Sequence, residues 1–223
     1  MAAGTDGLAT TRLGRLAARA TREREAVQER CELCGAPVEE QHRHLLDLSR
    51  HELMCTCRAC AILFAHRAAG GAGGHYRLVP DRRLGIADLE LDDVAWAELR
   101  LPVDIAFFVR AGAGGRVQAF YPSPMGPTES QLGLEAWEAL EAANPVLRTL
   151  EPDVEALLVN RSRGARQHWL VPIEDCYALV GLIRSGWRGL TGGAEVWRAI
   201  AAFFEGLDRR ARPAGRNDDG RST

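Results

Sequence analysis

Short runs of apolar, strand-forming residues predict two β-hairpins in the C-terminal two thirds of the chain. Residues 105–111 (IAFFVRA) and 116–121 (RVQAFY) flank the turn sequence GAGG. Residues 154–162 and 167–171 are also rich in strand formers, and the turn-like sequence RGA lies between them. We expect both hairpins to belong to one antiparallel sheet.

Three further segments of this region place apolar residues at helical spacing. The first, residues 134–143, ends where Pro145 follows, because proline cannot continue a helix. The second begins after Pro172, which suits a first helical turn. The third begins near residues 191–193 and runs to Leu207. Since hairpins and helices are mixed without a regular strand-helix alternation, the predicted fold class is α+β.

Changes in composition along the chain predict a small N-terminal module beside one larger domain. Residues 1–30 form a basic, weakly helical arm, and residues 31–66 form a cysteine-rich module. Residues 67–74 have the glycine- and alanine-rich composition of a flexible linker. Residues 75–208 contain all five tryptophans, so we place the main hydrophobic core there. The tail, residues 209–223, is predicted to be disordered.

The overall composition restricts the class of protein. With 46% hydrophobic and 26% charged residues, the 223-residue chain matches a soluble globular protein. A net charge of −2 provides no positive field for a nucleic-acid backbone, so we do not expect nucleic acid as a partner. No segment has the apolar length of a signal peptide or a membrane span, and we expect a cytoplasmic protein. In a reducing compartment, clustered cysteines favour metal binding over disulfides.

Two CxxC pairs provide the most specific signal in the sequence. Cys31 and Cys34 form the first pair and precede Gly35, whose backbone freedom suits a metal-binding turn. Cys57 and Cys60 form the second pair. Zinc prefers four tetrahedral ligands, and two such pairs supply four thiolates. We therefore predict that these four cysteines bind a metal in a zinc-ribbon-like module.

The segment between the pairs supports this assignment. Residues 44–48 and 52–55 read as two strands around a turn at residues 49–51. Such a hairpin would bring the two cysteine pairs together. The metal site is therefore compatible with the predicted local structure.

Other side chains in the same hairpin leave alternatives open. Cys55 lies two residues before Cys57 and shares its strand face, so either thiol could be a ligand. We prefer Cys57, because it completes a CxxC pair, and interpret Cys55 as a small buried side chain. His42, His44 and His51 could each be a ligand, a titrating group or a polar strand residue, and we prefer the last interpretation.

Four thiolates also suit a single iron, as in rubredoxin, or an iron-sulfur cluster. The first pair, CELCG, fits a rubredoxin sequence. The second pair is followed by Ala61, where rubredoxins have glycine, and the segment between the pairs lacks their aromatic packing. Zinc is therefore the preferred metal, and iron is the alternative.

The remaining candidate for chemistry is residues 120–130 (FYPSPMGPTES). We expect a rigid, proline-rich loop that leaves a strand and enters a helix, with Tyr121 and Ser130 among its exposed contact residues. Glu129 and Ser130 have no evident histidine partner, so hydrolase chemistry is unsupported. We predict no catalytic residues and a protein that is not an enzyme.

The chain contains the motifs CELCG, HRHLLDL, CTCRACAILF, YPSPMGPTES, EPDVEALLVNR and WLVPIEDCYALVGLIR. Together these motifs resemble an uncharacterised actinobacterial family whose members are encoded beside genes for nickel-iron uptake hydrogenases. The resemblance extends from about Arg30 to Leu207 and implies a hydrogenase accessory protein. Its partners would be hydrogenase subunits or maturation factors. The alternative function is a rubredoxin-like or iron-sulfur protein that relays electrons from the hydrogenase.

Overall fold

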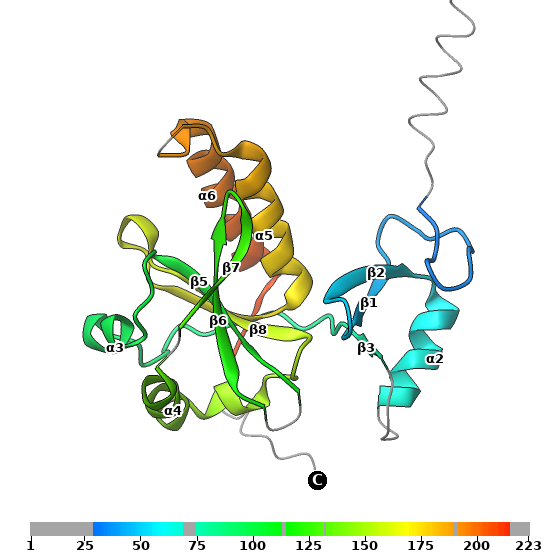
Figure 1. The fold of residues 1–223 in the computed structure, drawn as a ribbon, viewed down its shortest axis with the longest axis horizontal. Coiled ribbons are helices and arrows are strands. Elements are labelled where there is room, and N and C mark those ends of the chain that lie inside the picture. Colours follow the sequence, from blue (N-terminus) through cyan, green and yellow to red (C-terminus); the bar gives the residue numbers. More distant parts are fainter. Residues whose placement is uncertain (1–28, 69–74, 113–114, 132, 190, 215–223) are drawn as a thin grey trace, which may run out of the picture.

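The computed structural model describes residues 29–68, 75–112, 115–131, 133–189 and 191–214. Figure 1 shows a small sheet with helix α2 beside a larger sheet that is flanked by helices. Most of the predicted N-terminal arm, most of the predicted linker and most of the predicted tail lie outside the described residues. None of the described helices is long and apolar enough to cross a membrane.

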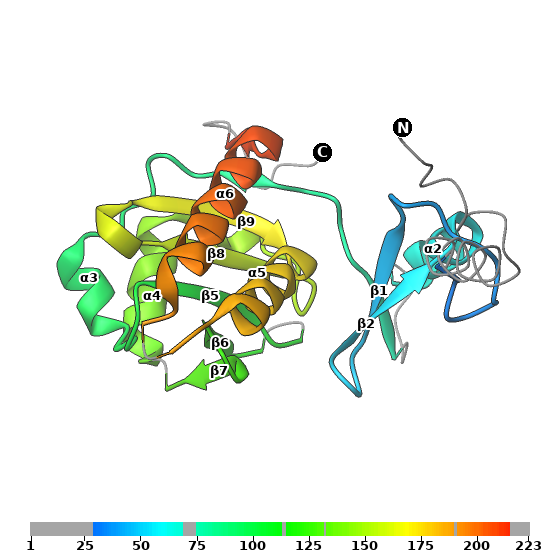
Figure 2. The ribbon, with the colours of Figure 1, turned by 90° about the horizontal axis from the view of Figure 1, so that it is seen from above.

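The N-terminal module is a three-stranded antiparallel sheet with one helix packed against it. The strand order is β2-β1-β3, so the central strand pairs with the other two. Leu45 of the central strand is fully buried. Figure 2 shows α2 beside β1 and β2. The elements are β1 (Arg43–Asp47), β2 (Glu52–Thr56), α2 (Arg58–Ala68) and β3 (Tyr76–Leu78).

The predicted hairpin of the module is confirmed as β1 and β2. Asp47 forms the turn, because its Oδ1 accepts hydrogen bonds from the backbone of Ser49 and Arg50 at 2.8 and 3.2 Å. The third strand comes after the glycine-rich segment. The structure therefore places Tyr76–Leu78 in the N-terminal sheet, whereas the sequence assigned residues from 75 onward to the larger domain.

The C-terminal domain, which we define as the described residues from 79 to 214, is built on a seven-stranded sheet. Its strand order is β10-β4-β9-β8-β5-β6-β7, and all neighbours are antiparallel except β10 and β4. The strands are β4 (Leu84–Gly85), β5 (Ile105–Arg110), β6 (Val117–Ser123), β7 (Gly126–Ser130), β8 (Glu155–Asn160), β9 (Gln167–Pro172) and β10 (Arg212–Pro213).

Helices cover both faces of this sheet (Figure 2). Helices α5 and α6 pack on one face, and α3 and α4 lie on the other. The helices are α3 (Asp93–Glu98), α4 (Leu134–Ala143), α5 (Ile173–Gly186) and α6 (Gly193–Arg210), with the 3-10 turns η1 (Pro145–Thr149) and η2 (Ser162–Gly164).

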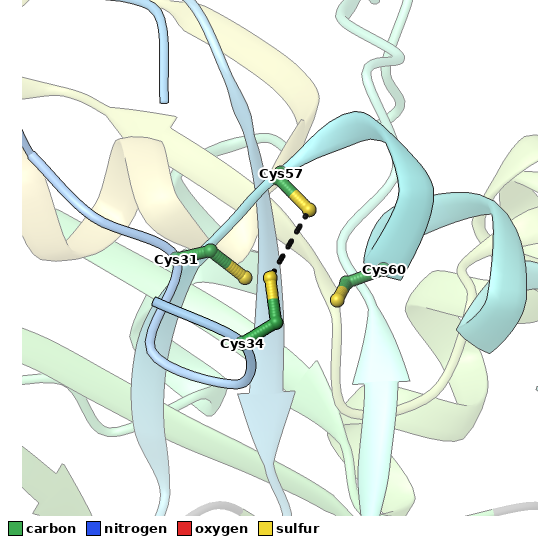
Figure 3. A group of neighbouring side chains, drawn as sticks. All are labelled: Cys31, Cys34, Cys57 and Cys60. Atoms are coloured by element: carbon green, nitrogen blue, oxygen red, sulfur yellow. Dashed lines mark hydrogen bonds between the residues drawn. The ribbon is translucent and has the colours of Figure 1, made fainter. Parts of the chain in front are cut away.

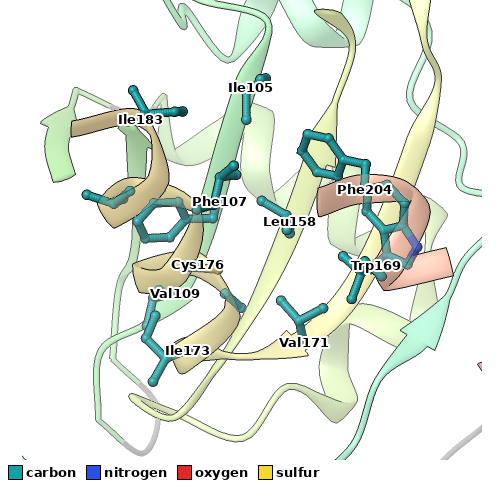
Figure 4. Close-up of a cluster of buried hydrophobic side chains, with 14 of the residues drawn as sticks. Ile105, Phe107, Val109, Leu158, Trp169, Val171, Ile173, Cys176, Ile183 and Phe204 are labelled. Carbon is teal, nitrogen blue, oxygen red and sulfur yellow. The ribbon is translucent and has the colours of Figure 1, made fainter. Parts of the chain in front are cut away.

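Alternating side chains of the central strands belong to two separate hydrophobic cores, one on each face of the sheet. Phe107 and Leu158 point to the face of α5 and α6, where they pack with Trp169 and Phe204 (Figure 4). Phe108 and Leu157 point to the opposite face. Because successive strand residues face opposite sides of a sheet, both faces can be apolar along the same strands. The mixture of sheets and helices confirms the α+β class.

The local predictions for this domain are mostly confirmed. The two hairpins are β5–β6 and β8–β9, and the three predicted helices are α4, α5 and α6. The C-terminal end differs from the prediction, since α6 continues to Arg210 and β10 pairs in parallel with β4.

The prediction of a loop at residues 120–130 is wrong. Most of this segment forms the hairpin of β6 and β7, in which Pro122 lies opposite Pro127. Ser123 closes the turn by donating a hydrogen bond of 2.8 Å to the carbonyl of Gly126. Pro127 lies in β7, the edge of the sheet, where no further strand needs its missing N–H group. Pro122 lies in β6 beyond the last pair that this strand forms with β5, Phe107 with Phe120.

The module and the domain contact each other through apolar and polar side chains. Leu46 of β1 belongs to the same buried cluster as α5 and α6. Arg77 of β3 donates a 2.6 Å hydrogen bond to the carbonyl of Pro152. In Figures 1 and 2, β1 and β2 lie between α2 and the C-terminal domain. The face of the hairpin opposite α2 is therefore the one that meets the domain.

Candidate metal centre

The four cysteines predicted as ligands come together at one end of the N-terminal module. One sulfur from each of Cys31, Cys34, Cys57 and Cys60 lies within 4.8 Å of the others, and the sulfurs of Cys34 and Cys57 are 3.6 Å apart. Figure 3 shows the four thiols converging from a loop and from the start of α2. We call this group the four-cysteine centre.

The first pair lies in a tight turn. The amide of Gly35 donates to the carbonyl of Cys31 at 2.8 Å, and the amide of Cys31 donates to the carbonyl of Ala36 at 2.8 Å. Gly35 has a φ of +72°, a left-handed conformation that side chains with a Cβ rarely adopt. Glycine at this position therefore lets the chain reverse and present both sulfurs on one side.

The second pair has a different geometry from the first. Cys57 immediately precedes α2, and Cys60 lies in the first turn of that helix. The amide of Ala61 donates to the carbonyl of Cys57 at 2.9 Å, which begins the helical pattern. The sequence predicted no helix at this pair, and the structure places one there.

A pair of hydrogen bonds ties the first turn to the end of β2. The amide of Glu32 donates to the carbonyl of Cys55 at 3.0 Å, and the amide of Cys55 donates to the Glu32 carboxylate at 2.6 Å. These bonds hold the two cysteine pairs at a fixed separation. The site is therefore organised by backbone contacts as well as by the sulfurs.

Two of the four thiols, those of Cys31 and Cys60, differ strongly in pKa. Burial raises the pKa of Cys31, but hydrogen bonds from the backbone N–H groups of Cys57 and of the first turn lower it by more, so the pKa of this thiol is about 6. Burial and the neighbouring sulfurs raise the pKa of Cys60 to about 12. One thiolate forms readily, whereas four would repel one another without a cation. A thiophilic divalent ion would remove that repulsion.

The donor set limits the chemistry of the centre. Four cysteine sulfurs can hold zinc or iron, and both metals accept tetrahedral thiolate coordination. Because the protein would fill all four positions, no position remains for a substrate. Such a closed site suits a structural ion or an electron-transfer iron.

Cys55 lies outside the four-cysteine centre. Its ligand atom instead groups with those of His42 and His44, again within 4.8 Å of one another. Sequence reasoning treated these three residues separately and missed the grouping. The available signal was the spacing of the histidines, because His42 lies two residues before His44, directly before β1. His51 lies in the β1–β2 turn and is exposed.

Cys176 lies in the core of the C-terminal domain and is fully buried. Burial raises its pKa well above the ordinary value for a thiol, with a smaller contribution from the neighbouring Asp175. A buried, protonated thiol is a poor nucleophile. The structure therefore places Cys176 in the core and not in a reactive site.

Comparison with known proteins provides a family but no described activity. No curated protein and no solved structure matches the chain significantly. One family model, described as a family of unknown function (DUF5947), matches residues 30–211, which include the four-cysteine centre and nearly all of the C-terminal domain. The chain therefore belongs to the DUF5947 family.

Proposed function

We propose that this protein is a non-enzymatic, metal-binding accessory protein. A zinc ion at Cys31, Cys34, Cys57 and Cys60 would fold the N-terminal module, and the folded module would present a surface to a partner protein. The observation that carries the proposal is the convergence of four sulfurs at a closed site. A closed thiolate site contributes folding energy and no open coordination position.

The small core of the module supports a structural role for the ion. A domain of this size buries too little apolar surface to be stable alone, so small modules commonly need a metal or disulfides. Among the described residues up to 78, few hydrophobic side chains are buried. They are Cys31, Val38, Leu45, Leu46 and Ala61.

Zinc is favoured over iron by the form of the second cysteine pair. That pair opens α2, and Ala61 rather than glycine follows Cys60. The centre therefore departs from the two similar glycine-containing turns expected of a rubredoxin. An iron centre that carries electrons is the alternative function, since Cys34 is exposed and could bring iron near a redox partner.

A role in protein binding is supported by the outer surface of the module. Ile62 and Leu63 of α2 are 52% and 53% exposed, although both are large and apolar. They lie on the same helix as Cys60. Exposed apolar side chains next to a metal-folded turn are typical of a contact surface.

The partner that we propose is a subunit or a maturation factor of a nickel-iron uptake hydrogenase. This part of the proposal rests on the resemblance of the sequence motifs to a family encoded beside hydrogenase genes. Co-purification of the tagged full chain with hydrogenase subunits tests it. Loss of the complex in Ile62→Asp, with an unchanged metal content, would support the proposed surface.

Elemental analysis and a visible spectrum of protein purified without oxygen test the metal. A colourless protein that loses one equivalent of zinc in Cys34→Ser and none in Cys176→Ala supports the proposal. A coloured iron centre that dithionite bleaches reversibly would support the electron carrier instead. Protein without zinc or iron would contradict both functions.

A further inference from the structure

We propose that His42, His44 and Cys55 form a second metal site, which binds one transition-metal ion such as Zn²⁺ between the N-terminal module and the C-terminal domain. The site uses none of the four-cysteine ligands. It therefore does not depend on the function proposed above.

The backbone places these three side chains on one face of the β1–β2 hairpin. His42 and His44 are two residues apart, and their ring centroids are 4.7 Å apart. Cys55 pairs directly with His44 in the strand register. Side chains directly opposite each other on antiparallel strands lie on the same face. The grouping thus follows from the hairpin itself.

The distances are close to those of a metal site. One ligand atom from each residue lies within 4.8 Å of the others. Ligands about 2.0–2.3 Å from a tetrahedral zinc ion are separated by about 3.5 Å. The three atoms would therefore have to approach by roughly 1 Å, which side-chain rotation can supply without a change of the hairpin. Two imidazoles and one thiolate suit zinc and its neighbours in the transition series.

Hydrogen bonds orient both imidazoles as in a metal site. Nδ1 of His44 lies 2.8 Å from a carboxylate oxygen of Glu174, which belongs to α5 of the C-terminal domain. Nδ1 of His42 lies 2.8 Å from the carbonyl of Glu39. When Nδ1–H donates to such an acceptor, Nε2 keeps a free lone pair for an ion. Metal-bound histidines commonly have this outer partner.

Nε2 of His42 supplies independent evidence of a ligand. It is buried without a hydrogen-bond partner among the described residues, and the side chain is only 8% exposed. The carboxylate of Glu29 lies 3.7 Å away, beyond hydrogen-bonding distance. A buried polar atom without a partner is costly and uncommon in folded proteins. A metal ion at this nitrogen removes that cost.

The site would connect the two parts of the protein. Both histidines line a cleft of about 480 Å³, together with Arg83, Glu174 and Arg210 of the C-terminal domain. Glu174 is the outer partner of His44 and also accepts a hydrogen bond from Arg83 at 3.1 Å. An ion held by β1 and β2 would therefore strengthen the contact with α5. Three protein ligands leave a fourth position for solvent from the cleft.

Metal titration of the full, reduced, metal-free chain tests this site. We expect two equivalents of Zn²⁺ in the wild-type protein and one in His44→Ala. The matched control is His51→Ala, which removes an exposed histidine from the same hairpin and should keep both equivalents. Glu174→Gln should weaken the second equivalent by about 10- to 100-fold, because it removes the outer partner.

Cys34→Ser separates this proposal from the four-cysteine centre. If the four-cysteine centre binds no metal, the wild-type protein takes up one equivalent, which His44→Ala removes and Cys34→Ser retains. A second equivalent that survives in His44→Ala would overturn the second site. Uptake of one equivalent that Cys34→Ser removes would overturn it as well.

X-ray absorption provides a test that does not require a folded variant. With two zinc ions bound to the wild-type chain, we expect a first shell that contains both sulfur and imidazole nitrogen. A shell of sulfur alone would overturn the second site.

Discussion

Removal of the metal should unfold the N-terminal module and leave the C-terminal domain folded. The β1–β2 ladder has five residue pairs and β1–β3 has three, so the backbone framework of the module is small. A structural zinc ion contributes about 10–16 kcal/mol at neutral pH, which exceeds what such a small core supplies. The loss of that contribution should leave the module open for much of the time.

The distribution of tryptophans allows the two parts to be observed separately. All five tryptophans lie between Trp96 and Trp197, so tryptophan fluorescence reports on the C-terminal domain alone. Chelation should leave the emission maximum unchanged. Amide hydrogen exchange in β1, β2 and α2 should accelerate by more than about a hundredfold. Even one third of the free energy that the zinc ion contributes corresponds to more than about a hundredfold change in the equilibrium between the closed and the open module.

Amides of β5 and β8 are the internal control for this experiment. They lie in the centre of the seven-stranded sheet and should keep their protection. If β1 and β2 keep their protection after elemental analysis confirms that the metal is gone, the structural role of the centre is refuted. A red shift of tryptophan emission on chelation would also contradict the separation of the two parts.

Three further predictions concern single residues. Arg82→Ala should lower the free energy of unfolding by about 3 kcal/mol in urea denaturation, because the fully buried Glu155 loses the hydrogen bond of 2.9 Å that Arg82 Nε donates to its carboxylate. The control Arg148→Ala removes an exposed arginine and should change the free energy of unfolding by less than about 0.5 kcal/mol. Gly35→Ala should weaken metal binding about tenfold in a competition titration, because a residue with a Cβ at a φ of +72° costs about 1–2 kcal/mol. The control Gly181→Ala, in α5, should leave the metal affinity unchanged. Burial lowers the pKa of His168, so the folded state resists protonation of this side chain and the C-terminal domain should lose stability as the pH falls below about 6.5. His168→Leu should reduce that loss of stability in acid titrations followed by tryptophan fluorescence. An identical loss in the variant and the wild type would contradict the assignment.

Elements with strong local signals could be predicted from the sequence. The hairpins of β5–β6 and β8–β9 combine strand formers with turn residues, and α4 ends where Pro145 follows. The CxxC pairs are local as well, since two residues and a turn place both sulfurs together. The four-cysteine centre could therefore be predicted without knowledge of the fold.

Elements that depend on distant partners could not be predicted. Strand β3 is three residues long and forms only by pairing with β1, and β10 forms only against β4. The prolines of residues 120–130 indicated a loop, because the sequence does not reveal that β7 is a sheet edge. The contact of His44 with Glu174 joins residues 130 positions apart, so the grouping of histidines and Cys55 became visible only in the structure.

The central claim is that four cysteine sulfurs hold one metal ion, and the Cys55→Ser variant allows it to be tested alone. This substitution removes the thiol of the proposed second site and leaves the four-cysteine centre intact. X-ray absorption of this variant, purified without oxygen and loaded with one equivalent of zinc, should show four sulfur ligands at about 2.3 Å. A first shell that contains nitrogen or oxygen, or failure to bind one equivalent, would contradict the claim.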